Sequence, residues 1–306
     1  MLLSSLFPIS ALALGSVAAA GTSQRASLIV FGDSLSDNGH MPHYSNYSKY
    51  WGGRYSNSYM WNEYSAKLLD LNLENYAIGG FHDRQQLIPS VTEIVHQYLA
   101  NNTNVSDYKK KNSIIAIDGG GNDLFYSLDN LSTGKMSITY FIDTLHQDLL
   151  LDDGYRKIYL LNLPSLTMAP ALAEALAGML TPVLNAVFRT KLTALRLKNP
   201  SKAAENLMDT SNSPMVLRAI NVTDTKNPCV VDHADGSQTY CTDDDIRYYY
   251  DSFHPSGRPH YLIGVAFANI VKNPSYPVTK WSLTDIAKQY DIAHSDKNHN
   301  ILASSA

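Results

Sequence analysis

The chain has 306 residues, of which 44% are hydrophobic and 17% are charged. This proportion supports one sizeable hydrophobic core and excludes an intrinsically disordered chain. The net charge of -4 gives no reason to expect a polyanionic partner, so nucleic-acid binding is not predicted.

The first twenty residues form an apolar segment that ends in small residues at Ala18 and Ala20. This pattern predicts a signal peptide over residues 1–20, cleaved near Gly21, although no Lys or Arg precedes the apolar run. The alternative is a buried or membrane-spanning helix. Pro8 interrupts the run, however, and its apolar part is shorter than the roughly 20 residues that cross a bilayer. We therefore expect a secreted, extracellular protein without a stable membrane anchor.

Residues 21–306 show one composition throughout and no internal repeat, which predicts a single domain with a C-terminal extension after Pro277. In an oxidising compartment, Cys229 and Cys241 are most simply one disulfide that closes a surface loop; a metal pair or two free thiols are the alternatives. Export also predicts N-glycosylation at the N-x-S/T triplets that begin at Asn46, Asn101, Asn104, Asn130 and Asn221.

Strand-like and helix-like segments alternate along the chain. Apolar, β-branched segments predict strands at 27–31, in the region ending at Tyr76 and Ala77, and at 113–117, 157–161 and 214–220. Helical patterns lie at 61–69, 90–100, 137–151, 171–197 and 261–271. This alternation predicts an α/β protein with a central parallel sheet of about five strands, covered by helices on both faces.

The segment FGDSLSDNG at 31–39 carries the first candidate for chemistry. A turn directly after the first strand would raise the Ser34 hydroxyl at the carboxyl end of the sheet, where open α/β sheets bind their ligands. The alternative is that Ser34 only caps a helix.

The segment YYYDSFHPSG at 248–257 carries the second candidate, since Asp251 and His254 are three residues apart. A serine hydroxyl is a poor nucleophile until a base removes its proton, and a histidine base works best when a carboxylate fixes its tautomer. The alternative is an Asp251 helix cap beside a surface histidine. The run Asp243, Asp244 and Asp245 can supply a rival acid, although an acidic surface loop is the ordinary interpretation.

Two glycine-containing segments follow the next strands. Asn122 in IDGGGNDLF can donate a side-chain hydrogen bond to an oxyanion, and Gly80 in NYAIGG lets a backbone N–H approach a ligand closely.

In order and placement, these four segments resemble the blocks of the SGNH, or GDSL, hydrolases, from Phe31 to about Gly257. The resemblance implies a flavodoxin-like three-layer α/β/α sandwich. It implies Ser34 as nucleophile, His254 as general base and then acid, and Asp251 as the residue that orients it. The implied oxyanion donors are the backbone N–H groups of Ser34 and Gly80 and the Asn122 side chain. The G-x-S-x-G elbow of the α/β-hydrolases is not found.

A narrower resemblance rests on GRYSNSYMWNEYSAKLL at 53–69, NLP at 162–164 and the late cysteine pair, which are similar to longer fungal and plant GDSL esterases. Within these, the chain resembles the fungal acetylesterases of carbohydrate esterase family sixteen. This implies a monomeric enzyme without metal or cofactor that hydrolyses short-chain, acetyl esters, with a small ester or an acetylated oligosaccharide as substrate. Phe81 and His82 depart from the usual Ala-Thr after Gly80, and Phe81 either narrows the acyl side of the cleft or fills the core.

Several alternatives stay open. The chain can instead be a secreted lipase or phospholipase for longer acyl chains, a non-catalytic carbohydrate-binding protein on the same fold, or an effector with incidental esterase activity. Trp51 and Tyr55 can stack on a sugar or fill the protein interior; for Trp61, in a helical pattern, the interior is favoured. His40 and His43 can share a metal, but no third ligand with convincing spacing is present.

Overall fold

The computed structural model of the protein describes residues 25–39, 50–79, 89–119, 130, 133–135, 137, 153–161 and 207–303. Its centre is a parallel sheet of β1 (Ser27–Phe31), β2 (Asn72–Asn75), β3 (Ile114–Ile117) and β4 (Ile158–Leu160). The strand order is β2-β1-β3-β4, with Val30 aligned to both Asn75 and Ala116. This is the order in which the flavodoxin-like doubly wound sheet begins.

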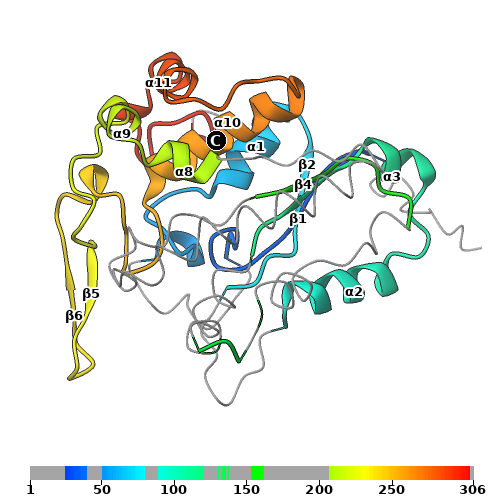
Figure 1. The fold of residues 1–306 in the computed structure, drawn as a ribbon, viewed down its shortest axis with the longest axis horizontal. Coiled ribbons are helices and arrows are strands. Elements are labelled where there is room, and N and C mark those ends of the chain that lie inside the picture. The colour runs from blue at the N-terminus through cyan, green and yellow to red at the C-terminus, as the bar shows by residue number, and fades with distance from the viewer. Residues whose placement is uncertain are drawn as a thin grey trace, which may run out of the picture.

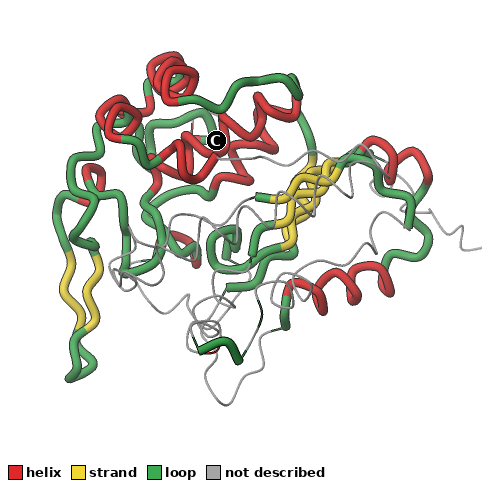
Figure 2. The backbone as a smooth tube through the Cα atoms, viewed as in Figure 1, coloured by secondary structure: helices red, strands yellow, loops and turns green. Residues whose placement is uncertain are grey.

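The middle strand β1 is apolar in four of its five residues because it is covered on both faces. All five of its residues are buried, as expected for a strand inside a parallel sheet. Helix α1 (Trp61–Leu69) lies against one face, and α2 (Val91–Asn101) lies against the other (Figure 1). The strands therefore lie between two helical layers (Figure 2), which confirms the predicted α/β class.

Helix α10 (Gly257–Lys272) packs closely on α1. Gly264 permits this contact, because a Cβ at that position would lie 2.5 Å from the Trp61 carbonyl oxygen and 2.7 Å from Tyr64 Cβ. Aromatic pairs fill the rest of the interface, with Trp61 against Phe267 at 5.1 Å and Tyr64 stacked on Tyr261 at 4.3 Å between ring centroids. This packing holds α10, whose first residue, Gly257, comes three residues after His254.

On the other face, Tyr98 of α2 meets Phe31 at the end of β1, with ring centroids 5.2 Å apart. Helix α2 begins with a reciprocal cap in which Ser90 accepts from the Glu93 amide and Glu93 accepts from the Ser90 amide. The short helix α3 (Asp107–Asn112) then leads into β3.

The predicted strand at 214–220 is wrong, because this segment forms α9 (Pro214–Ala219), preceded by α8 (Leu207–Ser211). Pro214 stands at the first helical position, after the N-cap Ser213, where its missing N–H costs nothing. Val216, Leu217 and Ile220 are buried, and this spacing matches one face of a helix better than the alternation of a strand. The described part of the sheet therefore has four strands instead of about five.

The C-terminal part begins with an antiparallel hairpin of β5 (Val230–Asp232) and β6 (Gln238–Tyr240), which projects from the body in Figure 1. The 3-10 turn η4 (Asp244–Ile246) follows it, and another, η1 (Trp51–Gly53), lies before α1. After Pro277 come α11 (Lys280–Gln289) and η5 (Ile292–His294), and their Leu283, Ile286 and Ile292 are buried in the main core.

The predicted signal peptide and the predicted helices at 171–197 and, apart from Ser137, at 137–151 lie outside the described residues. Among the helices that are described, none is long and apolar enough to cross a membrane.

Candidate active site

Ser34 lies in a tight turn three residues beyond the end of β1. The amides of Ser36 and Asp37 both donate to the Asp33 carbonyl oxygen, each over 3.0 Å, and the Asp33 carboxylate accepts from the Leu35 amide over 3.0 Å. The turn is therefore closed by local hydrogen bonds that Asp33 supplies. It places Ser34 at the carboxyl end of the sheet, as predicted.

The structure brings Ser34, His254 and Asp251 together. Ser34 Oγ lies 2.7 Å from His254 Nε2, and His254 Nδ1 lies 2.7 Å from Asp251 Oδ2 and 2.8 Å from Oδ1. The three residues are only 8%, 6% and 7% exposed, so little water competes for these hydrogen bonds.

The charge on Asp251 decides which histidine nitrogen carries the proton. Burial alone raises the pKa of Asp251, but the attraction of His254 and hydrogen bonds from His254, the Phe253 amide and Tyr50 together hold its pKa below the ordinary value. An ionised carboxylate can only accept hydrogen bonds. His254 Nδ1 must therefore be the donor, which leaves the Nε2 lone pair to accept from the Ser34 hydroxyl.

The segment that carries Asp251 and His254 is a closed turn held from behind. Asp251 Oδ1 accepts from the amides of Phe253 and His254, each over 2.8 Å, and the Tyr250 amide donates to the His254 carbonyl oxygen over 2.7 Å. Ser56 Oγ donates to the Pro255 carbonyl oxygen over 3.0 Å. The backbone around the histidine is thus fixed by residues 50–60, the strap that precedes α1.

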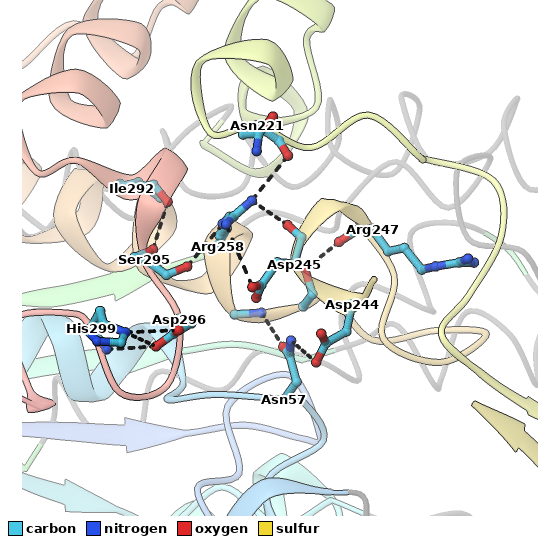
Figure 3. Close-up of polar contacts among 12 residues, drawn as sticks. Asn57, Asn221, Asp244, Asp245, Arg247, Arg258, Ile292, Ser295, Asp296 and His299 are labelled. Carbon is cyan, nitrogen blue, oxygen red and sulfur yellow. Dashed lines mark hydrogen bonds and ion pairs between the residues drawn. The ribbon is translucent and has the colours of Figure 1, made fainter. Parts of the chain in front are cut away.

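The next turn of chain is fixed by a second polar cluster, drawn in Figure 3. Asn57 accepts from the Gly257 amide over 2.7 Å and donates to Asp244 over 2.9 Å. Arg258 then donates to three carbonyl oxygens, those of Asp245 (2.8 Å), Ser295 (3.1 Å) and Asn221 (3.3 Å). These contacts anchor the first turn of α10 and thereby the residues just before it.

The segment after β2 approaches the nucleophile closely. A Cβ on Gly79 would lie 2.2 Å from Tyr55 Cε2 and 2.8 Å from Ser34 Cα, so no larger residue fits. The Gly79 amide donates to Asp37 Oδ2 over 2.8 Å, and the Tyr55 ring lies 4.8 Å from the His254 ring between centroids. Tyr55 is only 6% exposed, so it supports the histidine and is not available as a sugar-stacking platform.

A second carboxylate, Asp118, lies at the end of β3 beneath the serine turn. It accepts from Ser36 Oγ over 2.7 Å, and Ser36 Oγ in turn accepts from Trp61 Nε1 over 3.0 Å. Burial and the nearby Asp33 charge raise the pKa of Asp118 to about 7, against the opposing hydrogen bonds from Ser36 and the Gly119 amide. The serine turn thus rests on a buried, readily protonated carboxyl group.

Some of the remaining candidate residues from the sequence lie within the described part of the chain, and others lie outside it. The two cysteines form the Cys229–Cys241 disulfide. The Asp243 carboxylate binds Arg247 and the Asp244 carboxylate binds Asn57, so the rival-acid interpretation is not supported. Trp51 is covered by the Arg54 guanidinium, 4.6 Å from its ring, and Trp61 is buried in the core. The candidates outside the described residues are His40, His43, Asn46, Gly80, Phe81, His82 and Asn122. The sequon asparagines Asn101, Asn104, Asn130 and Asn221 are exposed.

The profile of the family described as GDSL-like Lipase/Acylhydrolase matches residues 28–266. The chain belongs to this family. Apart from Ser27, the GDSL match spans the four described strands of the central sheet, and it includes all three residues of the Ser34, His254 and Asp251 cluster. Membership of an acylhydrolase family supports ester hydrolysis as the activity.

Among curated proteins, the chain is similar to the thermolabile hemolysin of Vibrio parahaemolyticus, with 32% identity over 151 residues. The match covers 47% of this chain and 35% of the hemolysin, so the chain spans about a third of that relative's length. The narrower resemblance to fungal acetylesterases is confirmed by neither match, so it stays a prediction about this GDSL protein.

Sequence reasoning missed Asp37, Asp118 and Tyr50, which lie around the cluster, and considered Tyr55 only as a sugar-stacking or interior residue. Asp37 lies in the same segment as Ser34, FGDSLSDNG, and Asp118 lies in the same segment as Asn122, IDGGGNDLF. Their place in these two segments was a signal that could have marked them as candidates. Tyr50 and Tyr55 lie in a tyrosine-rich stretch, HYSNYSKYWGGRY, in which no spacing marks one tyrosine from another.

Proposed function

We propose that the protein is a serine hydrolase of carboxylic esters that works through an acyl-enzyme. The observation that carries this proposal is the 2.7 Å contact between Ser34 Oγ and His254 Nε2, with Nδ1 of the same ring held by Asp251. A non-catalytic binding protein on the same fold has no chemical need to keep a serine, a histidine and a carboxylate aligned in this way.

In the first half-reaction, Ser34 Oγ attacks the ester carbonyl carbon while His254 Nε2 takes the hydroxyl proton. The tetrahedral intermediate collapses, the C–O bond to the alcohol breaks, and His254 gives its proton to the leaving oxygen. In the second, a water molecule attacks the acyl-enzyme, His254 accepts its proton, and that proton returns to Ser34 as the carboxylic acid leaves. Asp251 keeps the ring in the required tautomer and stabilises the imidazolium.

The developing oxyanion needs hydrogen-bond donors at the carboxyl end of the sheet. Within the described part of the chain, the Ser34 amide donates to no other residue, which leaves it available for this purpose. The Gly79 amide is already engaged by Asp37. This leaves the amide of Gly80, the next residue, and the Asn122 side chain as the further donors in the proposal.

For the substrate, we propose short-chain esters, with acetyl groups on carbohydrates as the first class to test. The resemblance of residues 53–69 to longer GDSL esterases supports this choice. A second candidate is a lipid ester with a longer acyl chain, which the similarity to a thermolabile hemolysin favours, since lysis of cells is a membrane event.

The proposed place of action is outside the cell. The disulfide supports this part of the proposal, because such bonds persist mainly in oxidising compartments. The apolar leader at residues 1–20 and the four exposed sequon asparagines of the described residues agree with it.

The test compares hydrolysis of nitrophenyl acetate, butyrate, octanoate and palmitate by the wild type, Ser34→Ala and Ser237→Ala. Removing the nucleophile should lower kcat by at least about 10⁴-fold, whereas Ser237, exposed in the hairpin turn, serves as the matched control with unchanged activity. A preference for acetate leads to acetylated oligosaccharides as the next substrates; a preference for octanoate or palmitate selects the lipid candidate. Equal rates for wild type and Ser34→Ala would remove Ser34 from the mechanism.

A further inference from the structure

The Asp251 carboxylate has a second side-chain partner besides His254. Tyr50 donates its phenolic hydrogen to Asp251 Oδ2 over 2.7 Å, across 201 residues of sequence. Within the described part of the chain, no other side chain apart from His254 donates to this carboxylate. Both oxygens of Asp251 are therefore occupied: Oδ1 by the turn amides, and Oδ2 by Tyr50 together with the His254 ring.

Tyr50 is held in place by aromatic neighbours on both sides. Its ring centroid lies 5.7 Å from that of Tyr55, which itself covers His254, and 5.6 Å from that of Tyr250, directly before Asp251. Tyr250 in turn is tied to the disulfide hairpin, because the Val230 amide donates to the Tyr250 carbonyl oxygen over 2.7 Å. The phenol therefore approaches the carboxylate from a fixed direction.

The Tyr50 phenol remains a donor at every working pH. Burial and the Asp251 charge raise the pKa of Tyr50 far above its ordinary value. A hydrogen bond from a neutral donor to a buried carboxylate disperses its charge and restrains its rotation. Because its rotation is restrained, the carboxylate keeps Oδ2 aligned with His254 Nδ1. Because its negative charge is dispersed, it stabilises the imidazolium form of His254 less strongly.

From these contacts we infer that Tyr50 is a positioning residue for the proposed hydrolysis: it acts through Asp251 to align His254 with Ser34. This inference rests on the proposed function for its chemistry, since it concerns the base of the same reaction. Among the described residues, no hydrogen bond joins Tyr50 to Ser34, so the inferred effect of Tyr50 passes through the Asp251 carboxylate and the His254 imidazole.

Several other titratable groups lie around the Tyr50–Asp251 pair, and the Tyr50→Phe substitution leaves their side chains chemically unaltered. Burial and the proximity of His254 lower the pKa of His260 to about 3, so this histidine stays neutral in the working range. The groups that face the pair or its immediate neighbours are Tyr55 before α1, Tyr250 beside Asp251, Asp232 from β5, Asp244 from η4 and His260 from α10.

The test is Tyr50→Phe, which deletes the hydroxyl and keeps the ring. We expect kcat to fall by about 10-fold, as for a lost hydrogen bond to a charged group, with KM little changed. The carboxylate that remains has a less dispersed charge and holds the imidazolium more strongly. The acidic limb of the pH profile of kcat/KM should therefore move to higher pH, by about half a unit.

Tyr240→Phe is the matched control, because Tyr240 packs against the same small hydrophobic cluster as Tyr50 but its hydroxyl binds Gln238 on the hairpin. Its kcat and pH profile should equal those of the wild type. Unchanged kcat and an unmoved acidic limb in Tyr50→Phe would overturn the inference. So would a rise in KM without a pH shift, which would make Tyr50 a substrate contact or a structural residue.

A second measurement separates this inference from the choice of substrate. A fluorophosphonate reacts covalently with an activated serine whatever ester the enzyme prefers, and the pH dependence of its rate reports the same base. If Tyr50→Phe reacts more slowly with the fluorophosphonate and the acidic limb of its rate profile lies at higher pH, the inference is supported. This holds even if every nitrophenyl ester proves a poor substrate. No reaction of the wild type, with Ser34 intact, would mean that the proposed function itself has failed.

Discussion

At the scale of single residues, the geometry around Ser34 depends on how closely three segments approach one another. The serine turn, the segment after β2 and the strap that carries Tyr55 meet at Gly79, where there is no room for a Cβ. Hydrogen bonds hold these segments in place, among them the bond that the Gly79 amide donates to Asp37 in the serine turn. A side chain at position 79 must therefore displace the nucleophile or the ring that supports His254.

Gly79→Ala should for this reason lower activity much more than stability. A displacement of about 1 Å at the reacting groups costs on the order of 100-fold in rate, and we expect a loss of kcat of that size with the fold retained in circular dichroism. Gly236→Ala is the control: its backbone is less favourable for alanine than that of Gly79, with a φ of 81°, but nothing lies within 4 Å of the added Cβ. Wild-type kcat in Gly79→Ala would show that the segment after β2 yields without moving Ser34.

The residues nearest the chemistry differ in how far the sequence could predict them. Asp251 and His254 were predictable because three residues of separation bring both side chains to one turn. Tyr50 and Tyr55 were not, because their contacts with Asp251 and His254 join segments about 200 residues apart, and only the folded chain sets those distances. Burial, not residue type, makes Tyr55 a support for the histidine.

At the scale of elements, the hairpin of β5 and β6 continues into the segment that carries the proposed base. The Cys229 amide donates to the Tyr249 carbonyl oxygen over 3.2 Å, and the disulfide joins Cys229 to Cys241 across the end of the hairpin. The hairpin thus supports the tyrosines that precede Asp251. Loosening it should affect both stability and catalysis.

The double variant Cys229→Ser/Cys241→Ser should lose about 2 to 3 kcal/mol of stability in denaturant unfolding, as expected for a disulfide that closes a short loop. Under conditions in which the double variant is still fully folded, its kcat should fall and the acidic limb of its kcat/KM profile should move to higher pH. Both changes should be smaller than those expected of Tyr50→Phe. Leu283→Ala on α11 is the control, since removing this buried side chain costs a similar or larger free energy of unfolding. If both variants keep the wild-type pH profile, the hairpin contributes to stability alone.

The elements themselves were predicted well where the pattern was long or strongly apolar. β1, β3, β4, α1, α2 and α10 all lie where the sequence places them. The segment 214–220 was misassigned because a short run with two β-branched residues resembles a strand, while the decisive signal is Ser213 and Pro214 at a helix start. Local capping chemistry outweighed β propensity in this helix, which packs against α11.

At the scale of the whole molecule, stability depends on pH through the buried carboxyl groups that join the layers. Asp118 links the end of β3 to the serine turn, and through Ser36 to Trp61 of α1. Its pKa is raised to about 7 by burial and by Asp33, whereas an aspartate in the unfolded chain has a pKa near 3.9. Between about pH 4 and pH 7, the folded protein therefore holds a proton that the unfolded chain has released.

The sign of the effect follows from this difference in bound protons. Stability changes with pH in proportion to the protons bound in the unfolded state minus those bound in the folded state. For Asp118 this difference is negative, so its contribution is fully present below about pH 4 and declines as pH rises towards 7. Asp118→Asn cannot ionise, and its carbonyl oxygen can still accept from Ser36 Oγ, so the variant should lack this decline.

We therefore expect the stability of Asp118→Asn relative to wild type to rise by on the order of 3 kcal/mol between pH 4.5 and pH 7.5, measured by denaturant unfolding at a series of pH values. Asp107→Asn removes the same charge from an exposed position, so its difference from wild type should stay nearly constant over that range. A constant difference for Asp118→Asn as well would mean that Asp118 is ionised in the folded protein. The serine turn would then rest on two charged carboxylates, and a compensating positive group would have to lie close to them.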